Sequence, residues 1–465
     1  MRLLQAPFIA GLIATSLSDG PAPLTSSSRV HTPKACAAVA AATTEDDPLL
    51  SWLAKQGGHA RVASGTDENG LRGLVTTESV DVGTVLLEVP LTATLVDRGD
   101  GTSAESLPGE PPEWSASLPW NVQLALAVLA QRADPTSPWA PFLSSWPSEP
   151  PPLPKNLEPA QLAEAQDMRF EADVDGDYFW AAEQYAAVVE AAEAASLPTP
   201  CSDAELRWAL ELVWSRVLRL SCGTTHGVRR LLVPVLDLAN HEPQPSALFT
   251  YTAAAAGGGA VRLHAVRPLR AGDAVTITYG EESGAHFCQY YGFVPRDDPY
   301  ASWQISPLTL LAAVPVSMLA PPEGGWAAAA ASGALDLPRT LELGACLSLA
   351  EPLALLRAAG VGGGDDDADA DKGAAVALEA ALGAIIAAHP TSAEEDEALL
   401  DGVELPDAVR PLVQMRLGRK RMLELLRERL SADPHGAAPP LPSQYPALDE
   451  VPIEELEAWG SRPFE

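Results

Sequence analysis

Three short segments carry the side chains whose types and spacing could do chemistry. These are the pair Asn240–His241, the tyrosine Tyr279 at the end of a strand-like run, and the aromatic segment Tyr291–Phe293. An asparagine amide can both donate and accept hydrogen bonds to a ligand. A tyrosine hydroxyl can be directed at a reacting nitrogen, and aromatic rings can form the walls of a channel. These are the side-chain types that a site needs if it is to hold a ligand and orient an acceptor.

Each of these residues, taken alone, is explained equally well by core packing. Asn69–Gly73 is a weak signal of the same kind, because glycine lets a ligand approach the backbone closely but also makes plain hairpin turns. Its glycine spacing differs from that of the dinucleotide-binding fingerprint. His241 could coordinate a metal only with partners at ligand spacing, and neither His226 nor His264 provides them. We therefore expect no metal site.

Strands and helices must position these residues. Alternating and apolar runs bounded by turn residues predict strands at Asn69–Val75, Val85–Pro90, Leu231–Val235, Ala247–Tyr251, Val261–Val266 and Val275–Thr278. Helical spacing of apolar residues predicts helices at 120–132, 157–169, 178–196, 203–220, 285–290 and from Asp407 or Pro411 to Arg429. Ser392 and Glu395 have the spacing of a helix capping box.

Composition excludes several function classes. The chain has 465 residues and a formal net charge of −32, with 62 acidic and 30 basic residues. This charge argues against sequence-independent nucleic-acid binding, and it suits a basic partner or keeps an alanine-rich chain soluble. The five cysteines are scattered, which indicates neither a disulfide framework nor a zinc site. The longest apolar runs are too short to span a membrane.

The order of these signals resembles that of SET-domain methyltransferases. A glycine turn is followed by a helix with Arg216, then Asp-x-x-Asn-His ending at His241, then Tyr-Gly and Tyr-Gly-Phe. The similar branch is typified by plant Rubisco large-subunit lysine methyltransferase. Ser137–Leu143 and Trp208–Arg219 also look like segments of this branch. Thr391–Asp396 and the region 416–423 look, more loosely, like its C-terminal substrate-binding domain.

The resemblance implies an α+β fold. A β-rich SET domain with a knot-like cofactor site would span residues 48–298, with a helical insertion at about 150–220. An all-α substrate-binding domain would span 299–435, and 436–465 would be a tail. Residues 1–45 have an apolar start and a hydroxylated, acid-poor continuation, which is typical of a plastid targeting region. The alternative is a disordered tail on a cytoplasmic protein.

The resemblance also implies roles for individual residues. S-adenosylmethionine would be the cofactor, and Tyr279 would be the catalytic residue that orients the acceptor amine. Tyr279, Tyr291 and Phe293 would line the acceptor site, while Asp237 would support the knot. The residues that would bind the cofactor are Asn69, Gly70, Leu71, Arg72, Gly73, Arg216, Asn240, His241 and Tyr291. The implied function is methylation of a lysine in a non-histone protein. The enzyme is expected to be a monomer.

Four departures from the family pattern concern the acceptor more than the cofactor. Gly284 stands where the family usually has Asn, His286 replaces a common Glu, Leu218 replaces Phe, and Arg72 looks like an extra residue in the turn. Two alternatives therefore stay open. One is methylation of a protein histidine by the same fold. The other is a catalytically silent SET-fold module that only binds a protein.

Overall fold

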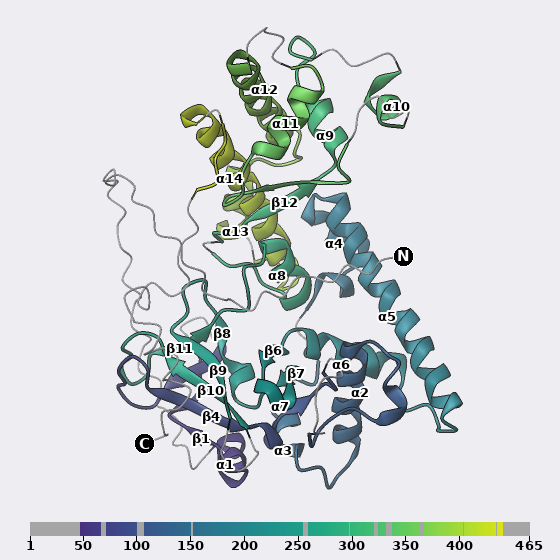
Figure 1. Cartoon of the computed structure of the whole chain (residues 1–465), viewed down its shortest axis with the longest axis vertical. Coiled ribbons are helices and arrows are strands. Elements are labelled where there is room, and N and C mark those ends of the chain that lie inside the picture. Colours follow the sequence, from purple (N-terminus) through teal and green to yellow (C-terminus); the bar gives the residue numbers. More distant parts are fainter. Residues whose placement is uncertain are drawn as a thin grey trace. The chain divides into compact units, whose positions relative to one another are not determined.

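The structure is a computed structural model. It describes residues 47–66, 71–99, 107–149, 152–253, 259–296, 298–319, 324–331, 337–361, 367–402, 404–433 and 435–439. The chain divides into two compact units (Figure 1). The described residues of the first unit come from Met1–Ser148 and Tyr185–Gly280, and those of the second from Glu149–Gln184 and Glu281–Ser443. The domain bounds expected from the sequence stay predictions.

Two antiparallel sheets make up much of the first unit. One has the strand order β1 (His59–Ala60), β4 (Val85–Pro90), β10 (Gly259–Ala265), β9 (Ala247–Ala253). The other has the order β5 (Leu95–Val96), β7 (Val228–Leu232), β6 (Leu218–Ser221). Strands β9 and β10 form the hairpin predicted from the sequence, and Figure 1 shows them beside β4.

A third sheet carries the residues of interest. Its strand order is β2 (Val62–Thr66), β3 (Arg72–Thr76), β11 (Ala274–Ile277), β8 (Asn240–His241). Strands β8 and β11 run parallel, with Asn240 opposite Thr276 and His241 opposite Ile277. Parallel strands need a crossover connection, and here the hairpin β9–β10 lies between them in the chain. The pairing brings the ends of two distant segments to one edge.

Helices complete the first unit. They are α1 (Pro48–Lys55), η1 (Leu91–Ala93), η2 (Glu113–Ser115), α2 (Trp120–Ala133), α3 (Ala140–Leu143), α6 (Asp203–Trp214), α7 (Gly223–His226) and η5 (Leu236–Leu238). Sequence signals explain where α6 begins: the Ser202 hydroxyl accepts a hydrogen bond from the Glu205 amide, and the Glu205 carboxylate accepts one from the Ser202 amide.

Two helix predictions differ from the structure. Helix α6 ends at Trp214 rather than near Leu220, and Leu218–Ser221 form β6 instead. The Ser215 hydroxyl donates to the carbonyl of Glu211, and the residues after it pair with β7, so sheet formation overrides the helical spacing of Val217 and Leu220. The second difference is α5 (Met168–Ala194), which is one long helix, whereas the sequence predicts a helix that ends at 169 and another that begins at 178. Gly176 lies within α5 and is exposed. A single glycine weakens a helix but does not have to end it.

The second unit is mainly helical, as predicted for the C-terminal region. Besides the first part of α5 it contains η3 (Pro154–Asn156), α4 (Pro159–Leu162), η4 (Ala163–Ala165), α8 (Gly284–Tyr291), α9 (Pro307–Ala313), α10 (Gly325–Ala331), α11 (Ala350–Ala358), α12 (Asp367–Ala387), α13 (Ala393–Gly402) and α14 (Arg410–Ala432). It also contains an antiparallel pair that the sequence analysis missed, β12 (Ser302–Ile305) with β13 (Leu341–Gly344). The capping box of Ser392 and Glu395 is present at the start of α13.

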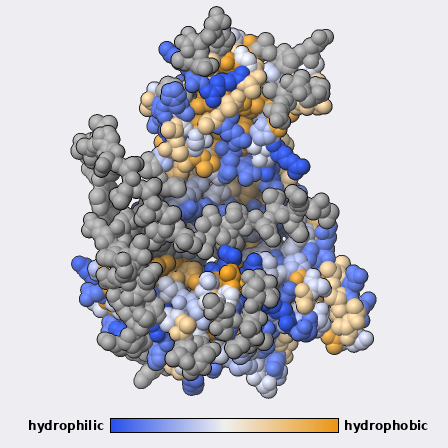
Figure 2. All heavy atoms as spheres, viewed as in Figure 1, coloured by the Kyte–Doolittle hydropathy of each residue, from blue (hydrophilic) through white to orange (hydrophobic). Residues whose placement is uncertain are grey.

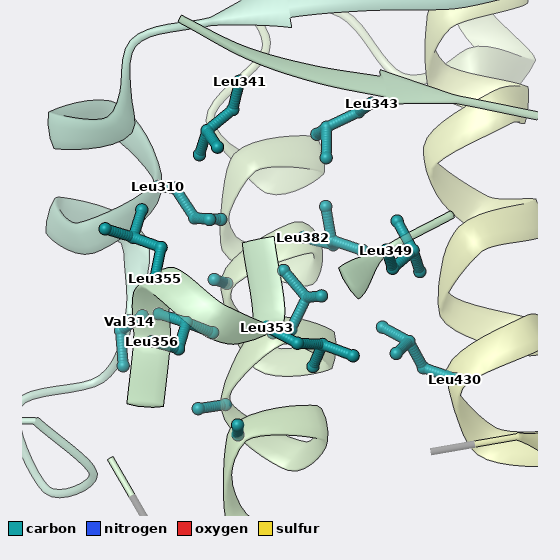
Figure 3. Packing of buried hydrophobic residues seen from close by; sticks show 14 of the residues in the cluster. Leu310, Val314, Leu341, Leu343, Leu349, Leu353, Leu355, Leu356, Leu382 and Leu430 are labelled. Carbon is teal, nitrogen blue, oxygen red and sulfur yellow. The ribbon is translucent and has the colours of Figure 1, made fainter. Parts of the chain in front are cut away.

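Leucine dominates the core of the second unit. Leucines of β13, α11, α12 and α14 meet Leu310 and Val314 of α9 (Figure 3). Burial of one such side chain contributes roughly 1.5–3 kcal/mol. Nearby, the fully buried Asp396 accepts hydrogen bonds from Arg416 and Lys420 at 2.9 and 2.5 Å. Two cations on one helix compensate the desolvation of this carboxylate, which would otherwise be costly.

The visible surface is mixed in hydropathy. On the face shown in Figure 2, hydrophilic and hydrophobic residues are interspersed over the described parts of both units. None of the described helices is long and apolar enough to cross a membrane.

Candidate active site

Strand pairing places Tyr279 beside His241. The Tyr279 backbone amide donates a hydrogen bond of 3.1 Å to His241 Nδ1, and the two ring centroids lie 5.4 Å apart. At its other end, the Tyr279 hydroxyl donates to the carbonyl oxygen of Ala239 at 2.8 Å. The ring is therefore fixed at both ends. A tyrosine hydroxyl oxygen can accept a hydrogen bond as well as donate one.

Burial sets the protonation of both residues. It raises the pKa of the Tyr279 hydroxyl above its ordinary value, an effect that the positive charge of Arg216 partly opposes. The hydroxyl therefore stays protonated at neutral pH. Burial lowers the pKa of His241 to about 4. A neutral imidazole agrees with the role of His241 Nδ1 as acceptor, which leaves the proton on Nε2.

Asn240 and the glycine turn contact each other. The Asn240 amide nitrogen donates to the carbonyl oxygen of Arg72 at 3.1 Å. A Cβ added to Gly73 would lie 2.6 Å from that nitrogen. A larger residue at this position would therefore force the Asn240 amide or the turn to move. Leu71 is 57% exposed, and the other two predicted turn residues, Asn69 and Gly70, lie outside the described residues.

Arg216, Asp237 and Trp146 form a buried polar cluster. The Trp146 indole donates to Asp237 Oδ2 at 3.0 Å, and Arg216 Nε lies 3.8 Å from the same oxygen. The guanidinium of Arg216 also lies 5.4 Å from the centre of the Trp146 ring. The Asp237 side chain is only 1% exposed. Its burial raises the pKa of Asp237 to about 6, although the charge of Arg216 opposes the shift.

This cluster retains unused hydrogen-bonding capacity. Asp237 Oδ1 and Arg216 Nε are buried, and among the described residues neither has a hydrogen-bond partner. A buried polar group without a partner costs free energy, so both atoms are expected to meet water or a ligand. Arg216 interacts electrostatically with both Asp237 and Tyr279. A change in the charge of Asp237 therefore acts on the same arginine that faces Tyr279.

A strained turn leads into the cluster. Val235 has φ +71° and ψ −47°, although it is β-branched and buried. Such a residue avoids the left-handed region, and local strain of this kind tends to occur at functional sites. Gly280, which follows Tyr279, has φ +131°. The backbone is thus unusual just before Asp237 and just after Tyr279.

The remaining predicted residues lie together in the second unit. The ring centroids of Tyr291 and Phe293 are 6.2 Å apart, and both rings pack near Phe287 at 5.7 and 5.3 Å. Gly292 between them has φ +75° and ends α8. The aromatic group expected from the sequence is thus present within this unit. That it closes one cleft with Tyr279 stays a prediction.

Most residues around Tyr279 and Asp237 could be identified from the sequence, but two groups could not. Trp146 and the carbonyl of Ala239 were missed, because the contact between Trp146 and Asp237 joins positions 91 residues apart and a carbonyl leaves no side-chain signal. Among the described residues, no three His, Cys, Asp or Glu side chains gather where a metal ion could bind.

Solved structures identify the fold. A structure of the SET domain of LSMT bound to lysine and AdoHcy matches with a TM-score of 0.59, covering 88% of this chain and 97% of that chain at 17% identity. Rubisco LSMT bound to AdoMet matches with a TM-score of 0.56 over 88% of this chain and 98% of the other, also at 17% identity. This chain therefore has the SET-domain fold, which confirms the expected fold class.

Two sequence relatives match part of this chain. Actin-histidine N-methyltransferase of Canis lupus familiaris is 31% identical over 180 residues, 37% of this chain and 30% of the relative. The enzyme of the same name from Danio rerio is 30% identical over 187 residues, 39% of this chain and 30% of the relative. This chain thus spans under a third of the length of these relatives. No protein-family model matches it.

Proposed function

We propose that this chain is an S-adenosylmethionine-dependent protein methyltransferase that modifies a side-chain nitrogen. The observation that carries the proposal is the doubly fixed Tyr279, held by His241 and by the Ala239 carbonyl. It stands in a fold shared with LSMT structures bound to AdoMet or AdoHcy. The N-methyltransferase names of the sequence relatives agree with this reaction class.

The first unit has groups that suit this cofactor. The orphaned Nε–H of Arg216 is a cationic donor for an anionic or carbonyl oxygen. Asn240 donates to Arg72 through its amide nitrogen, which leaves its amide oxygen as an acceptor. Gly73 keeps the neighbouring backbone accessible. We propose that Leu71–Gly73, Arg216, Asn240 and His241, with Asn69, Gly70 and Tyr291, bind the cofactor. When bound, it would supply an electrophilic methyl group.

Tyr279 would act on the acceptor by orientation rather than as a base. Its raised pKa keeps the hydroxyl neutral, and a neutral hydroxyl that donates to the Ala239 carbonyl can also accept an N–H of the acceptor through its oxygen. Alignment of a reacting nitrogen by a fixed group contributes to rate through proximity and orientation. Burial also favours the uncharged form of an inserted amine, which must lose its proton before it can react.

We propose lysine as the acceptor, presented by a non-histone protein. LSMT structures bound to lysine and methyllysine support this assignment. A second candidate is histidine, which the names of the relatives at 30–31% identity favour. Tyr279, Tyr291 and Phe293 would line the acceptor site in either case. The departures at Gly284 and His286 leave this choice to experiment.

The test is transfer of a labelled methyl group. The purified chain would be incubated with methyl-labelled S-adenosylmethionine and a protein extract, and the labelled residue identified by mass spectrometry. We expect label on a lysine side chain. Label on an imidazole would replace lysine by histidine. No label in any protein, although the chain binds a partner from the extract, would overturn the enzyme assignment in favour of a silent binding module.

A further inference from the structure

A cavity of about 260 Å³ opens on the first unit beside the Trp146 ring. It is formed where the last turn of α2, the end of α3 and the middle of α6 meet. Its main lining residues are Gln131, Arg132, Leu143, Ser144, Trp146 and Trp208. None of these residues belongs to the proposed cofactor or acceptor site.

The polar groups of the cavity are mainly hydrogen-bond donors. The Arg132 guanidinium lies 4.0 Å from the centre of the Trp208 ring, which holds its planar fork in place. Among the described residues its N–H groups meet no hydrogen-bond acceptor. The Gln131 carbonyl oxygen is occupied by the Ser137 hydroxyl at 2.8 Å, which leaves the Gln131 amide N–H groups available. The Ser144 hydroxyl donates to the carbonyl of Ala140.

Arg132 forms no ion pair among the described residues. Glu205 lies close enough for the charge of Arg132 to act on it, but its Oε2 accepts hydrogen bonds from the Ser202 amide and hydroxyl, each at 2.8 Å, and not from Arg132. The Arg132 fork is therefore available to a ligand carboxylate. Planar, bidentate recognition of a carboxylate is what an arginine fork favours.

Apart from Ser148, the rest of the lining is largely apolar. Leu143 and the rings of Trp146 and Trp208 supply a surface for one hydrocarbon group. The volume equals that of roughly nine waters at about 30 Å³ each, which suits a ligand of single amino-acid size. The combination of donors and an apolar surface fits a monocarboxylate with one apolar side group.

We propose that this cavity binds such a carboxylate, either as a free acid or as the carboxy-terminal residue of a peptide. Arg132 and Gln131 hold the carboxylate, and the indole rings take the apolar group. The bound carboxylate would lie against the ring of Trp146, whose indole N–H donates a hydrogen bond to the buried Asp237. The inference does not require methyl transfer, so it stands or fails separately from the proposed function.

The test is calorimetry of the full chain with N-acetyl-L-leucine. We expect saturable binding with a Kd in the millimolar range, on the order expected for a ligand of this size. N-acetyl-L-leucinamide, which lacks the charge, should not bind. Arg132→Gln should weaken binding by about tenfold. Arg169→Gln, which removes an exposed arginine of α5, should leave the Kd unchanged.

Two further arms make the result decisive. A leucine-terminated peptide with a free carboxyl should bind at least tenfold more tightly than N-acetyl-L-leucine if the occupant is a chain terminus, and equally if it is a free acid. Absence of saturable binding, or equal binding of the amide by the wild-type chain, would overturn the proposal. The amide comparison needs no variant, so it holds even if Arg132→Gln fails to fold.

Discussion

The indole of Trp146 donates a 3.0 Å hydrogen bond to the buried carboxylate of Asp237, although 91 residues separate them. The same carboxylate faces Arg216, and Arg216 in turn acts on Tyr279. Asp237 therefore contacts both Trp146, which follows α3, and Arg216, whose charge acts on the proposed catalytic tyrosine. The consequences of this link can be measured.

Replacing Asp237 by asparagine should change how stability depends on pH. The pKa of Asp237 is raised to about 6, whereas an unfolded aspartate has a pKa near 3.9. The folded chain thus binds this proton more tightly, so its contribution to stability is present below about pH 4 and is lost as pH rises through about 6. A pKa difference of roughly two between the folded and unfolded chain corresponds to at most about 3 kcal/mol of unfolding free energy.

Urea unfolding at pH 4 and pH 7 measures this effect. Between pH 4 and pH 7 the wild type should lose about 2–3 kcal/mol of unfolding free energy relative to Asp237→Asn. The variant keeps an acceptor for the Trp146 indole, so the comparison isolates charge. A difference that is independent of pH would contradict the raised pKa.

Gly73→Ala should disturb the Asn240 contact. The added Cβ would lie 2.6 Å from the Asn240 amide nitrogen, so the turn or the amide must move. We expect a loss of stability of about 1–3 kcal/mol and weaker cofactor binding. Gly176→Ala is the matched control, because nothing lies within 4 Å of its added Cβ in α5 and it should stabilise the helix by up to about 1 kcal/mol. Equal thermal shifts for the two variants would refute the close approach.

Asn240→Ala should weaken binding of S-adenosylmethionine. The substitution removes both the donor to the Arg72 carbonyl and the free amide oxygen. We expect roughly a tenfold rise in Kd, about 1.4 kcal/mol, measured by calorimetry with S-adenosylhomocysteine as a non-reacting probe. Asn156→Ala, a substitution in the second unit, serves as the control and should leave the Kd unchanged. An unaltered Kd for Asn240→Ala would remove this residue from the cofactor site.

Local patterns predicted the parts of the site that depend on local chemistry. Alternation and turn residues gave β9, β10 and β11, and the spacing of Ser392 and Glu395 gave the start of α13. The parallel pairing of β8 with β11 is nonlocal, and only the resemblance to a known family implied that His241 and Tyr279 meet. The end of α6 was wrong because pairing of β6 with β7 outweighs helical spacing. The positive φ of Val235 has no sequence signal at all, since valine disfavours that conformation.

The central claim is that the Tyr279 hydroxyl orients the acceptor nitrogen. Tyr279→Phe removes the hydroxyl and its bond to the Ala239 carbonyl, which should cost about 1–2 kcal/mol of stability. The decisive measurement is single-turnover methyl transfer to the substrate identified from the extract, alongside the Kd for S-adenosylhomocysteine. We predict a fall in the transfer rate of at least about a hundredfold, with the Kd changed less than about threefold. Transfer at the wild-type rate by this folded variant would contradict the account.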